Sequence, residues 1–480
     1  MTLKLYNTMG NEEEEFEPLE DNTVRMYTCG QTIYEDMHVG NAKTYAVWDV
    51  LKRYLKWKGY DVFHVMNITD VGHLTDDADQ GEDKVEKAAK EKQMEPMELV
   101  TRQVLRFYRE MDALNMEPAD VIPRATGHMI EMIEGIKSII ENGYGYEKNG
   151  SVYFDVMKFY EDHGYPELGG RRIEDMKKGA GGRVSEEEMQ EKRSPLDFAL
   201  WIKAVPEHIM KWPSPWSLGY PGWHLECSVM STKYLGEIFD IHGGGVDHIF
   251  PHHPNERAQN MAMNNLEEEP VKFWLHSEHI SVEGEKMSKS EGNFYTVSDL
   301  LDQYDGEVIR AYYASIHYRS QADFSFNSLE EAKKKLDRFY NTIRLAEAAE
   351  GGEGNELGEH IGDIENDFEA AMDDDMNTPL AMSKLIDFSK KINKNLDNKK
   401  ELIEEAVDKL KELARVLGLS LDSREKTAVE VDEFIRLLLQ IRQKMREKKE
   451  YGLADEIRDE LAEMGVVVED KEDGSGWHWK

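Results

Sequence analysis

Two stretches of the chain alternate apolar strands with helices, and this alternation limits the possible folds more than any other feature. Residues 24–28 and 61–66 predict strands, and residues 44–57 between them predict a helix. The same character returns in the strand-like segments 238–242 and 271–276. A strand, a helix and a second strand in succession are typical of parallel pairing, so we expect an α/β core built on a parallel sheet.

The segments between and after these stretches follow different patterns. Residues 126–212 carry a helix, a short strand and a stretch rich in Gly and Lys, which together predict an insertion into the α/β core. Beyond residue 300 the chain becomes helical, with one amphipathic helix at 329–349 and two or three more at 364–417. We therefore expect several domains, as the length of 480 residues allows.

A formal net charge of −37 bears on the choice of partner. Proteins that bind nucleic acids normally present a positive surface, so this charge weakens an RNA-binding interpretation without excluding it. A hydrated acidic surface is the simplest explanation, and it suits a salt-rich cytoplasm, where the Debye length falls to about 3 Å at 1 M. Any RNA site should then be a local basic or neutral patch. The densest acidic run, residues 11–21, predicts a surface turn between two short strands.

No stretch of the sequence has the composition of a targeting or membrane segment. A run of about 18 apolar residues is absent, so we expect no membrane span. The first residues lack the basic and apolar regions of a signal peptide. Two cysteines in so long a chain do not suit a disulfide framework, and they favour a cytoplasmic location.

The two cysteines lie in segments that look chemical rather than structural. Cys29 ends the first strand, where parallel sheets place ligand sites, and Cys227 follows Gly-Trp-His-Leu-Glu. His252 and Glu256 are four residues apart, so a helix would place both on one face. Each residue alone has a simpler explanation, because a lone cysteine is usually a small hydrophobe. Together, two thiolates, an imidazole and a carboxylate suit a four-coordinate Zn²⁺.

Two short motifs suit a triphosphate. His38-Val39-Gly40-Asn41 lies between the first strand and the first helix, where a glycine allows close approach and a histidine can donate to phosphate oxygens. An ordinary turn with a surface histidine would explain these four residues equally well. Lys286-Met287-Ser288-Lys289-Ser290 is a stronger signal, because a mobile loop with two lysines can clamp a triphosphate as its charge moves. A solvated basic loop is the alternative there.

A glycine-rich turn follows the strand predicted at 238–242. Gly243, Gly244 and Gly245 precede Val246 and Asp247, and such a turn can cradle a ribose whose hydroxyl donates to the aspartate. Taken alone, this turn is a weak signal.

Together these residues resemble the cysteine–tRNA ligases among the class I aminoacyl-tRNA synthetases. Residues 38–41 resemble the family's HIGH element, with Val39 for Ile and Asn41 for the second His, and residues 286–290 match KMSKS. The segments around the four candidate zinc ligands resemble the family's zinc site. The resemblance extends from about residue 20 to the C-terminus.

The resemblance implies a Rossmann-like parallel-sheet catalytic core with a connective insertion, followed by an α-helical bundle and a small C-terminal anticodon-binding module. The expected divisions are 1–125 and 213–300 for the core, 126–212 for the insertion, 301–350 for a stem-contact region, 351–424 for the bundle and 425–480 for the terminal module. Residues 374–379 look like the start of the bundle. The short insertion agrees with the absence of an editing domain.

The resemblance also implies the chemistry. ATP with Mg²⁺ and L-cysteine would form cysteinyl adenylate, and cysteine tRNA would accept the amino acid, with one Zn²⁺ per monomeric chain selecting the thiol. The expected phosphate stabilisers are His38, Lys286 and Lys289, and the remaining ATP site comprises Gly40, Asn41, Gly244 and Asp247. The residues expected to line the cysteine pocket are Gly30, Thr69, Trp223 and His224. The expected anticodon readers are Arg446, Asp455 and Asp470.

Two alternatives stay open at this point. A related ligase attaches cysteine to an amino-sugar in mycothiol synthesis and shares both motifs and the zinc logic, but it lacks a long anticodon module, so residues 425–480 argue against it. The second alternative is a catalytically inactive relative that only binds RNA or another partner. The intact Lys286 and Lys289 argue against that one.

Overall fold

The computed structural model describes most of the chain as two compact units. The described residues are 2–71, 74, 83–165, 168, 173, 191–282, 285–286, 294–422, 428–448, 450–463, 466–471 and 474–479. The first unit is Met1–Ser420 and the second is Leu421–Lys480. Among the described residues, no helix has the length and apolar character that crossing a membrane would require.

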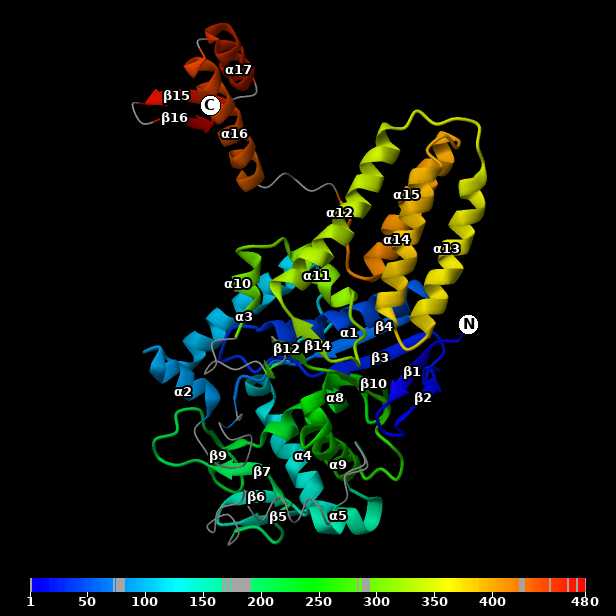
Figure 1. Ribbon diagram of the computed structural model, residues 1–480. Helices are drawn as coiled ribbons and strands as arrows, with labels where there is room; N and C mark the ends of the chain where they lie inside the picture. Colours follow the sequence, from blue (N-terminus) through cyan, green and yellow to red (C-terminus); the bar gives the residue numbers. More distant parts are fainter. Residues whose placement is uncertain are drawn as a thin grey trace. The chain divides into compact units, whose positions relative to one another are not determined.

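A four-stranded sheet forms the centre of the first unit (Figure 1). Its order is β11 (Val271–Ser277), β10 (Phe239–Gly245), β3 (Thr23–Thr28) and β4 (Asp61–Met66), and each neighbouring pair runs parallel. β10 is buried along almost its whole length, as expected for a parallel strand that is covered on both faces. The predicted parallel α/β core is therefore confirmed.

Helix α1 (Val39–Trp57) connects β3 to β4 and begins earlier than the predicted start at residue 44. His38 caps the helix, because its Nδ1 accepts hydrogen bonds from the backbone N–H groups of Gly40 and Asn41 at 3.1 and 3.3 Å. This cap satisfies two donors that a first helical turn leaves unpaired. The prediction was wrong at this end because Gly40 and Asn41 have low helix propensity, and the cap outweighs it.

The acidic run near the N-terminus forms a strand where the sequence predicted a turn. β1 (Lys4–Asn7) pairs antiparallel with β2 (Glu12–Glu15), a strand of four glutamates. Three of these glutamates are exposed, so their charges remain hydrated while the backbone pairs. The prediction was wrong for residues 12–15, because β-propensity depends more on the pairing partner than on the residues themselves, whereas the rest of the run lies outside β2.

The insertion folds around a five-stranded antiparallel sheet. Its order is β5 (Gly145–Lys148), β6 (Ser151–Phe154), β7 (Phe198–Lys203), β9 (Leu218–Pro221) and β8 (Trp212–Pro213). Helices α4 (Met129–Glu141) and α5 (Val156–His163) belong to the same region. The chain then re-enters the core through α8 (Trp223–Leu235), β10 and α9 (His252–Asn264).

Shorter elements complete the core. Helices α2 (Lys84–Glu91) and α3 (Pro96–Ala113) follow β4, and α10 (Val297–Leu301) and α11 (Gly306–Ala314) follow the central sheet. A small separate sheet contains β12 (Ile280–Val282), which pairs antiparallel with β13 (Glu285–Lys286) and parallel with β14 (Ala322–Phe324). Through β13, this sheet carries the first residue of the KMSKS-like motif.

Four helices lie side by side after the core (Figure 1). They are α12 (Phe326–Ala348), α13 (Glu356–Asp373), α14 (Thr378–Lys394) and α15 (Lys400–Val416). Leu336, Phe368 and Leu385 are among the fully buried residues of their apolar faces, so the predicted bundle is confirmed. Residues 374–379 join α13 to α14, and the expectation that they open the bundle was wrong.

The second unit has an apolar core of its own. It contains α16 (Ala428–Glu447), α17 (Tyr451–Glu463) and a hairpin of β15 (Val466–Lys471) and β16 (Gly474–Trp479). Ile435, Leu439, Leu461 and Val466 form the buried cluster of this unit. A cluster drawn from both helices and the hairpin makes this small unit a folded domain rather than an extended tail.

A buried ion pair joins α1 to the end of the bundle. Arg310 of α11 is 1% exposed and donates to the carboxylate of Asp49 in α1, which is 4% exposed. The Arg310 Nε also donates to the Leu417 carbonyl at 3.2 Å, just beyond α15. Asp49 accepts from the Arg53 guanidinium at 2.9 Å as well. The bundle is thus tied to α1 by charges that are withdrawn from water.

Replacing Arg310 with Leu should destabilise the first unit by about 3 kcal/mol, because breaking a buried pair leaves a carboxylate with fewer partners in the interior. Urea denaturation followed by tryptophan fluorescence measures the change. Arg344→Leu is the matched control, since Arg344 is exposed on α12 and the same charge is removed. Equal destabilisation by the two substitutions would contradict the role given to the pair.

Candidate metal centre and nucleotide site

Three elements of the core bring the four candidate zinc ligands together. Cys29 directly follows β3, and its backbone N–H donates to the Gly243 carbonyl of β10 at 3.0 Å. Cys227 lies on α8, and His252 and Glu256 lie at the start of α9. All four are buried, and their ligand atoms lie within 4.8 Å of one another. We call Cys29, Cys227, His252 and Glu256 the two-cysteine quartet.

The distances within the two-cysteine quartet suit a tetrahedral ion. The Cys227 Sγ lies 3.7 Å from the His252 Nε2, and the Cys29 Sγ lies 3.8 Å from the Glu256 Oε1. The His252 Nε2 is 2.9 Å from the same carboxylate oxygen. With zinc bonds of about 2.3 Å to sulfur and 2.0 Å to nitrogen or oxygen, ligand atoms in a tetrahedron are about 3.3–3.8 Å apart. Small side-chain adjustments would therefore accommodate the ion.

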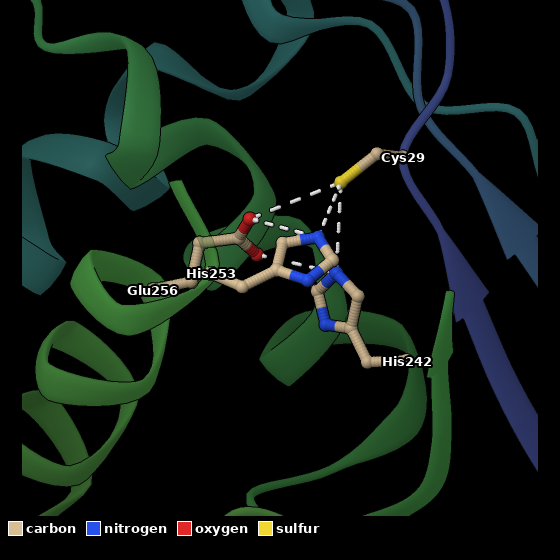
Figure 2. A group of neighbouring side chains, drawn as sticks. All are labelled: Cys29, His242, His253 and Glu256. Atoms are coloured by element: carbon tan, nitrogen blue, oxygen red, sulfur yellow. Dashed lines mark hydrogen bonds and ion pairs between the residues drawn. The ribbon is translucent and has the colours of Figure 1, made fainter. Parts of the chain in front are cut away.

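A second group shares two of these residues. His242 of β10 and His253 of α9 place their Nε2 atoms 3.6 and 3.4 Å from the Cys29 Sγ, and Glu256 lies beside them (Figure 2). We call Cys29, His242, His253 and Glu256 the two-histidine quartet. Its members are also buried, so the same cluster of side chains offers two overlapping candidate sets of ligands for one metal ion.

Outer hydrogen bonds orient one histidine of each quartet, His252 and His253. The His252 Nδ1 lies 2.8 Å from the His224 Nδ1, so the Nε2 faces the other ligands. The His253 Nδ1 lies 2.8 Å from the His276 Nε2, and the His276 Nδ1 is 2.8 Å from the Thr8 hydroxyl. Metal-binding histidines usually have such partners, because the second nitrogen fixes the tautomer and the ring orientation.

The charges of the cluster are unfavourable without a cation. Burial raises the pKa of Cys29 and of Glu256 well above their ordinary values. Burial also lowers the pKa of His242 and His253, and the neighbouring histidines lower them further. Among the described residues, neither the Glu256 Oε2 nor the His242 Nδ1 has a hydrogen-bond partner. Burial thus disfavours the charged forms of the Glu256 carboxyl and the Cys29 thiol, and a divalent cation would compensate their negative charge.

We did not predict His242, His253 or His276 from the sequence. His276 lies near the C-terminal end of β11, where parallel sheets place functional side chains, and His242 is the middle residue of β10. His253 directly follows the predicted ligand His252. A position near the C-terminal end of a predicted strand was the available signal, and we used it for Cys29 alone.

Two of the predicted cysteine-pocket residues, Trp223 and His224, contact His252 of the two-cysteine quartet, and Gly30 and Thr69 are joined through Asn67. The Trp223 ring stacks on the His252 ring with centroids 4.2 Å apart, and His224 bonds to the same histidine. The Gly30 N–H donates to the Asn67 side chain at 2.9 Å, and the Asn67 amide donates to the Thr69 hydroxyl at 3.1 Å. Trp223 is half-buried, so one face of this cluster retains access to solvent.

The cap of α1 determines the tautomer of His38. Because its Nδ1 accepts from Gly40 and Asn41, the ring hydrogen lies on Nε2, which is then a hydrogen-bond donor. The Val39 N–H donates to the Tyr295 carbonyl at 3.1 Å, and the Val297 N–H donates back to Met37 at 2.8 Å. The segment just after the KMSKS-like motif therefore lies against the start of α1.

The glycine-rich turn of β10 has a structural reason of its own. A Cβ atom on Gly244 would lie 2.6 Å from the His248 Nδ1 and 2.8 Å from the His253 Cε1. Any larger residue at position 244 would clash with these histidines, so their packing alone explains why glycine lies there. Asp247 lies on the following 3₁₀ turn, is exposed, and pairs with His279 at 3.0 Å.

Several predicted residues lie wholly or partly outside the described structure. Lys289 is not described, and Lys286 is described only as backbone in β13. Of the expected anticodon readers, Arg446 lies in the last turn of α16 and is half-buried, whereas Asp455 on α17 is exposed and pairs with Arg458 at 3.4 Å. Asp470 lies in β15, but its side chain is not described. Their base-reading role stays a prediction.

Family models match nearly the whole chain. A model described as the tRNA synthetases class I (C) catalytic domain matches residues 15–334, and a DALR domain model matches residues 367–422. A model of the cysteinyl-tRNA ligase anticodon binding domain matches residues 430–478. The last match lies in the second unit, which folds around its own core.

Curated relatives are similar over the same length. The cysteine–tRNA ligase of Thermococcus gammatolerans is 44% identical over 491 residues, covering 99% of each chain. That of Phocaeicola vulgatus is 42% identical over 490 residues, covering 99% of this chain and 98% of its own. That of Deinococcus radiodurans is 42% identical over 489 residues, covering 99% and 96%.

Solved structures agree on the fold. The Mycobacterium tuberculosis methionyl-tRNA synthetase in complex with methionyl-adenylate has a TM-score of 0.55 at 15% identity, covering 83% of this chain and 90% of its own. The Agrobacterium radiobacter LeuRS in a ternary complex with tRNA has a TM-score of 0.60 at 10% identity, covering 85% of both chains. At these identities the likeness concerns the fold alone.

The two quartets can be separated by metal content. We expect Cys227→Ala to lose most of its zinc and His253→Gln to retain about one zinc per chain, because zinc prefers two soft thiolates to one. Elemental analysis of protein purified without added metal gives the stoichiometry. The reverse pattern, with zinc lost only in His253→Gln, would assign the ion to the two-histidine quartet.

Proposed function

This chain belongs to the cysteine–tRNA ligase family of class I aminoacyl-tRNA synthetases, and we propose that it selects L-cysteine through one zinc ion held by the two-cysteine quartet. The observation that carries this proposal is the convergence of both cysteines of the chain with His252 and Glu256 in a buried cluster. The half-buried Trp223, stacked on His252, supports a substrate pocket at its open face.

Bound zinc would coordinate the substrate thiol in its deprotonated form, which the harder hydroxyl of serine, with its far higher pKa, offers poorly. The chain's own residues then set the geometry. Glu256 and Cys29 come from different elements, α9 and the end of β3, so rigid backbone would fix the metal ligands that orient the substrate. Gly30, Thr69 and His224 complete the proposed cysteine pocket. Selection by this chemistry would leave little need for an editing domain.

Class I synthetases activate the amino acid with ATP before transfer to tRNA. The carboxylate of cysteine attacks the α-phosphorus of ATP, pyrophosphate leaves, and the terminal adenosine of cysteine tRNA later accepts the acyl group. The substrate carboxylate is itself the nucleophile, so the protein's task is positioning and charge stabilisation. We propose that the His38 Nε2–H donates to the phosphate oxygens, a role that its capped tautomer supports.

The remaining ATP contacts are proposed from the motifs. Lys286 and Lys289 would neutralise the leaving pyrophosphate, which travels with Mg²⁺, while Gly40 and Asn41 would lie against the nucleotide. Gly244 and Asp247 would contact the ribose. The hydrogen bonds of residues 295 and 297 with the start of α1 support a common site, because these residues follow the second motif closely in the sequence.

The bundle and the terminal unit support tRNA as the acyl acceptor. The match of residues 430–478 to an anticodon binding domain disfavours the amino-sugar ligase, which lacks such a module. We propose that this unit reads the anticodon through Arg446, Asp455 and Asp470, and that residues 301–350 contact the acceptor stem. The enzyme is proposed to act as a monomer in the cytoplasm, where reduced cysteines remain available as ligands.

Lys289→Ala should lower the rate of adenylate formation by about 10²–10³, because it removes one stabiliser of the charge that develops on the phosphates. Cysteine-dependent pyrophosphate exchange measures the rate, and the KM for cysteine should change little. Lys137→Ala, on an exposed face of the insertion, is the control that removes a lysine elsewhere. An unaltered rate in Lys289→Ala would refute the assignment of the loop.

Ending the chain after residue 424 should leave pyrophosphate exchange largely intact and cripple the charging of cysteine tRNA, because the second unit has its own core and the removed segment contains no proposed ATP residue. The loss should appear mainly as weaker discrimination among anticodon variants of the tRNA. Aminoacylation assays with such variants provide the comparison. Unchanged kcat/KM and unchanged anticodon preference would show that the terminal unit is not the reader.

A further inference from the structure

A buried lysine in α1 has no part in the motifs described above. Lys43 is 1% exposed, and its ammonium donates to three backbone carbonyls: Glu278 at 2.7 Å, Tyr318 at 3.2 Å and Ser320 at 3.3 Å. Three acceptors match the three hydrogens of an ammonium group. Burial lowers the pKa of Lys43 to about 8, opposed by the nearby Glu278 carboxylate, so the charged form prevails at pH 7.

The three carbonyls belong to segments that lead to the proposed ATP loop. Glu278 lies between β11 and β12, and β12 pairs with β13 so that Ser281 lies opposite Lys286. Tyr318 and Ser320 precede β14, which pairs with the other edge of β12. Lys43 lies one helical turn after Gly40. One side chain therefore connects the start of α1 with the small sheet that carries Lys286.

Tyr318, whose carbonyl accepts from Lys43, also connects this region to the helical bundle. Its hydroxyl donates to the Asp375 Oδ1 at 2.5 Å, in the turn between α13 and α14. Asp375 also accepts from the Arg319 Nε at 2.5 Å and from the Tyr6 N–H at 2.9 Å. Asp375 is 2% exposed, and its carboxylate holds residues 318–320, the segment whose carbonyls accept hydrogen bonds from Lys43.

Hydrogen bonds hold this buried turn in place. Asp375 and Met376 both have a positive φ, at +50° and +52°, which costs energy for residues other than glycine and persists only where the surroundings enforce it. Tyr318 and Met376 are each 2% exposed, so the turn lies in the interior. The bonds to Asp375 therefore help to fix where Tyr318 lies.

We propose that Lys43 is a positioning residue for adenylate formation: with Tyr318 and Asp375 it sets the spacing between the start of α1 and the β12–β13 hairpin. The inference rests on the proposed function, since it concerns the two halves of the same ATP site. His38 and Lys286 lie on different elements, and both must reach one triphosphate. Errors of about 1 Å in such an arrangement can lower a rate about 100-fold.

The test compares Lys43→Met with Lys43→Arg, Tyr318→Phe and Asp375→Asn in cysteine-dependent pyrophosphate exchange, per active site counted by adenylate titration. Lys43→Met should lower kcat/KM for ATP about 10-fold to 100-fold, while the KM for cysteine and the zinc content stay as in the unaltered enzyme. Lys43→Arg, which keeps the charge and donors, should recover most of the loss. Tyr318→Phe and Asp375→Asn should show smaller losses in the same parameter, and Tyr318→Phe should add little to Lys43→Met because both act through one carbonyl.

Lys52→Met is the matched control. Lys52 lies on the same helix, is 2% exposed and donates to the Pro118 carbonyl at 2.9 Å and to Asp120 at 3.2 Å, away from the hairpin. It should change stability without changing the KM for ATP. Unchanged kcat/KM for ATP in Lys43→Met, or equal changes in the ATP and cysteine parameters of both lysine variants, would overturn the inference. If Lys43→Met does not fold, Tyr318→Phe and Asp375→Asn decide it. Absence of exchange in the unaltered enzyme would instead refute the proposed function.

Discussion

The placement of β3 between β10 and β4 is the constraint on which the candidate site depends. Parallel hydrogen bonding on both sides fixes where each strand ends, so Cys29, Gly244 and Asn67 emerge together at one edge of the sheet. There is no spare room at that edge, since a Cβ on Gly30 would lie 1.7 Å from the Asn67 carbonyl oxygen. A metal ligand that leaves the central strand must therefore meet the helices that cover the sheet, and α8 and α9 supply its partners.

Helix α1 extends that constraint to the rest of the first unit. Its 19 residues span about 28 Å, and its first turn lies in the proposed nucleotide site. The last turn is bound to the bundle, where the Tyr54 hydroxyl donates to Asp373 at 2.6 Å and the Trp57 indole donates to Glu412 at 2.9 Å. Lys58, the C-cap, pairs with Asp373 at 2.9 Å. One rigid element thus joins the region proposed to bind ATP with the region proposed to bind tRNA.

Elements with a local residue pattern could be predicted from the sequence. Features that depend on contacts between distant segments could not. The strands at 23–28 and 61–66 could be predicted because they are short segments rich in β-branched and aromatic residues. The start of α1 could not, because the His38 cap overrides the low propensity of Gly40. Cys29, Cys227, His252 and Glu256 stood out by their chemistry, whereas His242 and His253 became visible only when two strands and a helix met. Lys43 carries no motif at all, and three carbonyls distant in sequence give it a role.

The acidic charge of the chain is compatible with its proposed RNA partner. Repulsion between distant carboxylates and phosphates acts over a long range, whereas attraction between lysines and phosphates acts at contact. The helix α14 contains four lysines and one aspartate, so the bundle includes a basic helix within a chain of net charge −37. Lys390 and Lys394 are exposed on that helix. Salt near 1 M shortens the Debye length to about 3 Å, which removes repulsion from distant carboxylates while direct lysine–phosphate contacts persist in part. High salt would therefore weaken the long-range repulsion between carboxylates and RNA phosphates more than the short-range attraction between lysines and phosphates. The acidic surface need not prevent RNA from docking.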